Sequence, residues 1–172
     1  MASGPDRRVA LLSIHPRFAR SIMSGEKRVE FRKVRFRDEV SHIIVYATSP
    51  VQKVLGYFGV SHIDEAPPGR LWARYGAIGG VRKDEFRAYF ASSSQGVAIG
   101  VGEVEALREP LPLSVLGDSA TVPQSFSYLG ARAFEKLREL LRLQGRQTYP
   151  PACTMAAQRT ATYGAQHAVP AR

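Results

Sequence analysis

The sequence predicts an α+β domain with a small curved sheet or barrel and peripheral helices. Several apolar runs of strand length recur along the chain, and segments with helical spacing of apolar residues lie between them. The length of 172 residues fits a single domain, since most domains comprise roughly 100–150 residues. A hydrophobic share of 44% is sufficient for a core of that size.

The first two expected elements are a buried strand and a short helix. We expect residues 1–7 to form a flexible leader and the apolar run within residues 8–14 to form the strand. Pro16 then stands in the first turn of a helix, a position that proline favours. Gly25 is placed to cap this helix at its C-terminal end.

The next segment combines the period of a strand with an excess of positive charge. Six of the eleven residues from Lys27 to Arg37 are basic, and Glu30 is the one acid among them. Val29 and Phe31 alternate with the charged residues, which predicts a strand with one buried face. A basic strand anchored in this way holds cations at fixed positions, and fixed cations suit a phosphate or a nucleobase.

Two further strands are predicted before the middle of the chain, over residues 40–47 and 51–63. A turn that contains Ser49 separates them. Gly56 and Gly59 lie inside the second strand, where glycine usually marks a bulge or a close approach of another backbone segment. We therefore expect this strand to be irregular and tightly packed.

The second half of the chain is predicted to contain helices on either side of one strand. Residues 70–90 have helical spacing of large apolar residues, and the strand over 96–107 has an apolar phase that slips near Gly102, which predicts a bulge. An amphipathic helix follows over residues 131–143. Residues 144–172 contain no acid and no Leu, Ile, Phe or Trp, so we expect a disordered basic tail.

The charge balance favours a polyanionic partner. The chain has 24 Lys and Arg against 15 Asp and Glu, which gives a net charge of +9 and an isoelectric point near 10.1. Nucleic acid is the first class of partner that this charge suggests, and an acidic membrane surface is the second. A soluble basic protein with no such partner is the plain alternative, which net charge does not exclude.

Several other kinds of site find no support in the sequence. Cys153 is the single cysteine, which excludes an intrachain disulfide and a cysteine-based zinc site. His15, His42 and His62 do not have the spacing of metal ligands, and we expect neither a metal nor a cofactor. No apolar run has the length of a membrane span or a secretory signal, so we expect a cytoplasmic protein without a membrane partner.

Four separated blocks of sequence then form a pattern: Leu12–Ala19, Ile22–Lys33, Val45–Pro50 with Gly56, and Pro123–Leu129. In this order the blocks resemble the ASCH domain, a member of the PUA-like superfamily of small β-barrels. The resemblance covers roughly residues 8–130. It implies an ASCH-type, PUA-like barrel with peripheral helices, and we assign residues 8–143 to this domain together with its C-terminal helix.

The resemblance also implies where ligands bind. The family's cleft faces the helix that precedes the Lys27 motif and is associated with RNA or a single nucleobase. Some relatives resemble ribonucleases, and another branch resembles amidohydrolases that remove an acyl group from a modified cytidine. That branch uses a threonine three residues after the motif lysine. Glu30 occupies this position here, so acylcytidine amidohydrolase activity is not carried over.

The first set of candidate site residues is Lys27, Glu30 and Arg32. Lys27 could hold a phosphate or assist proton transfer, and Arg32 could donate two hydrogen bonds to a phosphate or a base edge. Glu30 could accept a hydrogen bond from a base or position a water molecule. The alternative for all three is a surface ion-pair group, which contributes little to stability.

The second set is Tyr46, Ser49, Lys53 and Ser125. Tyr46 offers a stacking face beside the cation of Lys53, and this combination binds single-stranded nucleic acid without sequence readout. Ser125 lies in the late block of the resemblance. The alternatives are a core tyrosine at position 46 and an ordinary turn at Ser49.

The sequence therefore supports three functions. The first is binding of RNA or a nucleotide in a basic cleft formed by both sets of residues. The second is a metal-independent ribonuclease, in which Lys27 or Lys53 stabilises charge on the phosphate and Tyr46 or Ser125 handles protons. The third is a protein-interaction module in a transcription or stress-response complex. The sequence leaves the oligomeric state open.

Overall fold

The computed structural model describes residues 8–118 and 120–145. The leader predicted over residues 1–7 lies outside the described residues, and so does the predicted tail from residue 146 onwards. Among the described helices, none combines the length and the apolar character needed to cross a membrane.

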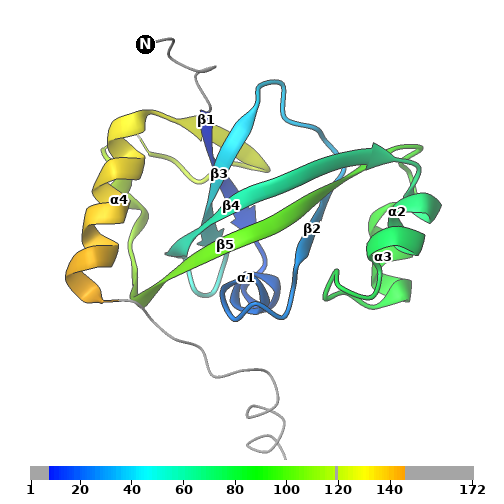
Figure 1. The fold of residues 1–172 in the computed structure, drawn as a ribbon, viewed down its shortest axis with the longest axis horizontal. Helices are drawn as coiled ribbons and strands as arrows, with labels where there is room; N and C mark the ends of the chain where they lie inside the picture. Colours follow the sequence, from blue (N-terminus) through cyan, green and yellow to red (C-terminus); the bar gives the residue numbers. More distant parts are fainter. Residues whose placement is uncertain (1–7, 119, 146–172) are drawn as a thin grey trace, which may run out of the picture.

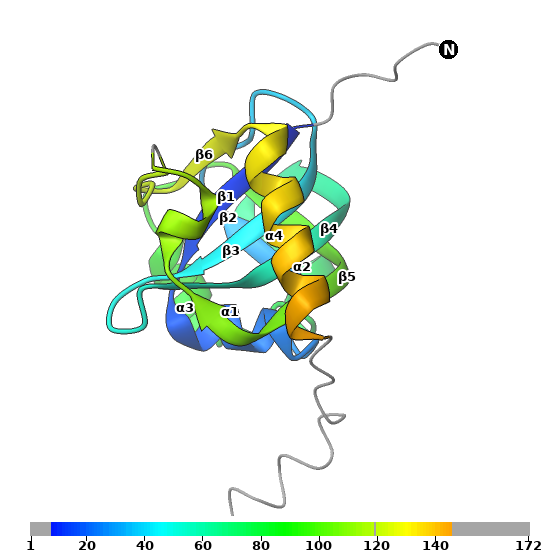
Figure 2. The same cartoon turned by 90° about the vertical axis from the view of Figure 1, so that its left-hand side faces the viewer.

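The described residues form one mixed sheet of six strands with the order β2-β5-β4-β3-β1-β6 (Figures 1 and 2). Only the β1–β3 pair is parallel among the pairings of this sheet. The strands are β1 (Arg8–Ile14), β2 (Val29–Arg32), β3 (Val40–Ala47), β4 (Lys53–Ala66), β5 (Gly96–Leu111) and β6 (Phe126–Leu129).

Four α-helices surround this sheet, which confirms the α+β class. Figure 1 shows α4 at one end of the molecule and α2 with α3 at the other. The predicted barrel is not shown, because the strand order ends in β2 and β6 and no backbone pairing in the described sheet joins these two ends. The helices are α1 (Pro16–Met23), α2 (Pro68–Tyr75), α3 (Lys83–Tyr89) and α4 (Ala131–Gln144), with a 3₁₀ turn over Leu113–Leu116.

The predicted elements are largely present, with two differences of note. Helix α1 ends as predicted, because Gly25 follows it with a φ of 79°. The bulge predicted near Gly102 is also present, since Phe58 pairs with Val104 while Val60 pairs with Val101. The helical segment predicted over residues 70–90 is two helices, and β6 was not predicted because its four residues are only half-buried.

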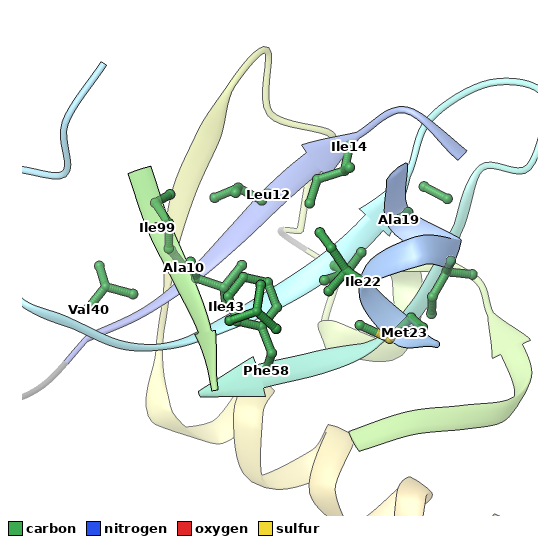
Figure 3. Close-up of a cluster of buried hydrophobic side chains, with 14 of the residues drawn as sticks. Ala10, Leu12, Ile14, Ala19, Ile22, Met23, Val40, Ile43, Phe58 and Ile99 are labelled. Atoms are coloured by element: carbon green, nitrogen blue, oxygen red, sulfur yellow. The ribbon is translucent and has the colours of Figure 1, made fainter. Parts of the chain in front are cut away.

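Three apolar clusters hold the sheet and helices together. The largest packs α1 against β1, β3 and β4, with Leu12, Ile22 and Phe58 among its fully buried members (Figure 3). A second cluster lies between α4 and the sheet. The third joins β2 and β5 to α2 and α3 through aromatic residues, which places those helices next to the short edge strand β2.

The close packing of β4 generates a stability prediction. Gly56 has a φ of 147°, and a Cβ there would lie 2.9 Å from the Ala106 Cα and even closer to the Glu105 carbonyl oxygen. We expect Gly56→Ala to lower the free energy of unfolding by about 3 kcal/mol, because backbone cannot move aside cheaply. Gly59→Ala is the matched control on the same strand, since its nearest neighbour is 3.9 Å away. Urea unfolding of both variants measures the difference, and equal effects would contradict the prediction.

Candidate functional site

A pocket of about 330 Å³ opens beside edge strand β2, between the start of α1 and helix α3. Charged side chains from β2 lie at its base, and aromatic rings line its walls. The basic strand is therefore anchored in the core, and its cations line one cavity, as the sequence predicted. The lining residues with polar or aromatic side chains are Ser13, His15, Arg17, Phe18, Lys27, Glu30, Phe31, Arg32, Glu85, Phe86 and Tyr89.

Lys27 is a buried lysine rather than a surface one, with 2% of its area exposed. The turn after α1 carries it inward, and its backbone N–H donates to the Ser21 carbonyl oxygen at 2.9 Å. Its ammonium group donates a hydrogen bond to the Gly79 carbonyl oxygen and lies 3.4 Å from Glu30 Oε2. The ion pair with Glu30 that was the alternative for Lys27 is therefore present, but it is buried and not at the surface.

Glu30 and Arg32 complete a buried charge cluster with Lys27. Glu30 is 6% exposed and lies between the two cations, with its Oε1 3.5 Å from Arg32 Nε. Arg32 Nη2 donates to the Ser13 carbonyl oxygen of β1 at 2.7 Å. Arg32 Nε is buried and faces Glu30 Oε1 as an ion pair, without the geometry of a hydrogen bond to any described residue.

Burial lowers the pKa of Lys27 below the ordinary lysine value of 10.5. Removal of the ammonium group from water is the main cause, because a low-dielectric site disfavours the charged form. The Glu30 carboxylate acts in the opposite direction and offsets part of this effect, while Arg32 adds a smaller repulsion. The pKa of Lys27 therefore depends on its burial and on the charged groups beside it.

Aromatic rings form the walls above this cluster. The Lys27 ammonium lies 5.1 Å from the centroid of the Phe18 ring and 5.4 Å from that of Phe31, within the range of cation–π attraction. Phe31 packs edge-to-face on Phe86 with centroids 4.8 Å apart. Tyr89 also lines the pocket and is 40% exposed.

An ion pair joins the two helices that flank the pocket. Arg17 Nη2 of α1 lies 2.8 Å from Glu85 Oε1 of α3, and both side chains are partly exposed. The hydrogen bond from Arg17 is the main cause of the lowered pKa of Glu85. The Arg17 guanidinium also lies 4.4 Å from the Phe18 ring centroid. The Arg17 cation of the pocket lining is therefore already paired with a carboxylate.

The second predicted set of residues lies outside this pocket. Tyr46 is 4% exposed and packs in the apolar cluster beneath α4. Ser49 is exposed in the turn after β3, and Lys53 begins β4 half-buried. Ser125 precedes β6. None of these four residues lines the pocket, so the structure separates the two predicted sets.

Ser13 connects the two sets and was not singled out by sequence. Its carbonyl oxygen accepts from Arg32, and its N–H donates to the Ser125 carbonyl oxygen at 3.3 Å. Its hydroxyl donates to the Pro123 carbonyl oxygen at 2.7 Å. It is also the register partner of Tyr46 in the β1–β3 pair. The two sets thus approach each other across one residue of β1.

Sequence reasoning also missed the contribution of α3. Arg17 and Glu85 are separated by 68 positions, and Lys27 and Gly79 by 52. No spacing rule connects residues so far apart. The one usable signal was a local spacing: Glu85 and Tyr89 are four residues apart and therefore share a helix face.

Comparison with known proteins agrees with this fold. Residues 12–136 match the family model of the ASCH domain. Over 144 residues the chain is 32% identical to a protein of Zymomonas mobilis named ASCH domain-containing ribonuclease, an alignment that covers 81% of this chain and 97% of the relative. The crystal structure of ASCH from Zymomonas mobilis is similar with a TM-score of 0.73 and 32% identity, over 78% of this chain and 96% of that one.

Fold and pocket together define a small α+β domain with a charged cavity at the edge of its sheet. The chain belongs to the ASCH domain family. The N-terminal domain of McrB from Staphylothermus marinus is similar with a TM-score of 0.51 at 12% identity, over 76% of this chain and 93% of that one. At that identity the likeness concerns the fold alone.

The lowered pKa of Lys27 predicts how stability depends on pH. The unfolded chain binds more protons than the folded one between the folded pKa of Lys27 and its unfolded value of 10.5. The wild type should therefore gain stability relative to Lys27→Met as pH rises through this window. Urea unfolding of both proteins at a series of pH values below 10.5 measures the difference. A difference that stays flat or falls with pH would contradict the burial of an ionisable amine.

Proposed function

We propose that the chain binds RNA and that the pocket beside β2 receives one nucleotide of a single strand. The observation that carries this proposal is the buried Lys27–Glu30–Arg32 cluster at the base of an aromatic-walled cavity. The guanidinium of Arg32 lines the pocket and is proposed to contact a phosphate or a base edge. Glu30, held between two cations, is placed to accept from an amino group of a base.

The size and lining of the pocket support a single nucleotide over a duplex. A volume of about 330 Å³ lies at the lower end of the range of roughly 300–1,000 Å³ for small-molecule sites. Bases that have left a stack are bound by aromatic rings and arginine planes, and Phe18 and Tyr89 supply such rings. A net charge of +9 supports an anionic polymer as the partner.

RNA cleavage is the second candidate function. The observation that favours it is the relative named ASCH domain-containing ribonuclease. A lowered pKa increases the share of a lysine present as the free amine, which can accept a proton, and burial lowers the pKa of Lys27. Tyr46, Lys53 and Ser125 remain proposed contributors from the neighbouring set. We propose that cleavage would not require a metal ion.

Binding is tested with Arg32→Gln against Arg70→Gln, which removes the same charge from an exposed position on α2. We expect Arg32→Gln to weaken binding of single-stranded RNA about tenfold, because a charge-assisted contact is lost. Arg70→Gln should change affinity less than about twofold. Native gels at moderate salt measure both affinities, and urea unfolding confirms that each variant is folded. Equal affinities of the two variants would overturn the proposed pocket.

Denaturing gels of the same samples, incubated with EDTA, separate the two candidate functions. Shortened RNA with the wild type but not with Lys27→Met would support metal-independent cleavage in this pocket. Intact but shifted RNA would support binding alone. The absence of both would overturn the RNA proposal and leave the protein-interaction module predicted from sequence.

The ion pair at the pocket mouth generates a prediction of tighter binding. Glu85→Gln removes a carboxylate from the pocket lining and releases Arg17 for a phosphate. We expect RNA affinity to rise about fivefold, since like charge at an interface opposes binding. Asp84→Asn is the matched control, because it removes the same charge from the adjacent residue, which pairs with Arg82 outside the pocket. Fluorescence anisotropy compares the two variants, and the same gain in both would show a net-charge effect only.

A further inference from the structure

The basic segment divides into cations inside the pocket and cations outside it. Lys27 and Arg32 line the cavity, whereas Lys33, Arg35 and Arg37 are exposed beyond its rim. The proposed binding of one nucleotide makes no use of these three residues. They nevertheless continue directly from the strand that forms the base of the pocket.

The segment that carries the outer cations is fixed to the core. Phe36 is 5% exposed and packs edge-to-face on Phe126 with centroids 4.7 Å apart. The Tyr128 hydroxyl accepts hydrogen bonds from the backbone N–H groups of Arg37 and Asp38, each at 3.0 Å. These contacts fix the backbone of the segment at Phe36, Arg37 and Asp38, so it is not a free basic loop.

The first cation of this exposed segment, Lys33, lies at the rim of the pocket. The Lys33 ammonium lies 5.0 Å from the centroid of the Tyr89 ring, and Tyr89 lines the cavity. From Arg32 to Arg37 the chain can extend over at most about 17 Å, since each residue adds about 3.3 Å. Asp38 and Glu39 follow, so the positive segment ends there.

We propose that Lys33, Arg35 and Arg37 form a track for the RNA backbone that leaves the pocket, with Tyr89 at its entrance. The inference rests on the proposed function and extends it from one nucleotide to a strand. Phosphodiesters next to the bound nucleotide are paired with these cations, and a neighbouring base stacks on the exposed part of Tyr89. The ligand is thus a single strand and not a free nucleotide.

The acidic residues beside the track are compatible with this role. Arg35 pairs with Glu65 at 3.1 Å, and Arg8 pairs with Asp38 at 2.9 Å. All four side chains are more than two-fifths exposed, and exposed ion pairs are weak and screened by salt. A phosphate can therefore replace Glu65 at Arg35 with little loss.

The track is tested with the double variant Lys33→Gln/Arg37→Gln. Its control is Lys136→Gln/Arg142→Gln on α4, which removes the same charge at the far end of the molecule (Figure 1). Anisotropy measures affinity for a single-stranded RNA of about 12 nucleotides, a length within single-strand site sizes. Chemical-shift titration measures affinity for nucleoside monophosphates. Both ligands are tested against the full chain.

We expect the track variant to bind the oligonucleotide about tenfold more weakly and to bind nucleoside monophosphates as the wild type does. Its slope of log affinity against log salt should fall in magnitude by about 1.4, or about 0.7 for each lost phosphate contact. The α4 control should match the wild type. Equal oligonucleotide affinity and salt slope in the two double variants would overturn the track. Equal loss of monophosphate binding would place these residues in the pocket instead. If the wild type binds neither ligand, the proposed function itself fails.

Discussion

The placement of one carboxylate between two buried cations is the constraint on which this domain depends. Glu30 pairs with both Lys27 and Arg32 and offsets part of the cost of burying the Lys27 ammonium group. Each cation then donates a hydrogen bond to a different segment. Lys27 holds the Gly79 loop, and Arg32 holds the end of β1. On the side of β2 that has no strand partner in the described sheet, these side-chain hydrogen bonds connect β2 to the neighbouring segments.

The segment between β4 and β5 packs next to this charge network. Helices α2 and α3 lie in that segment and bury the apolar face of β2 through Phe86 and Phe90. Because Phe31 turns toward those rings, the alternation of the strand directs Glu30 and Arg32 to the opposite face. The pocket at this edge of the sheet is lined from both faces of β2, since Glu30, Phe31 and Arg32 all line it. Packing and charge placement are two results of one sequence pattern.

The sequence was informative about local structure and much less so about which residues meet. The period of two around Val29, the cap at Gly25 and the slip near Gly102 follow from steric rules that act over a few residues, and the structure contains all three. The burial of Lys27 depends on a carbonyl 52 positions away, which no local pattern encodes. The two sets of candidate residues were predicted to share one cleft, yet they lie on either side of Ser13. Long-range register decides that separation, and a single sequence does not specify it.

The charge of the buried cluster depends on the protonation state of Lys27. With one acid and two bases, it bears a net charge of +1 when Lys27 is protonated and is neutral when Lys27 is not. Desolvation favours the neutral state, whereas any anion that enters favours the charged one. An anion bound beside Lys27 would raise the pKa of its ammonium group, in the direction opposite to the effect of burial. Anion binding in the pocket and the protonation of Lys27 would thus depend on each other.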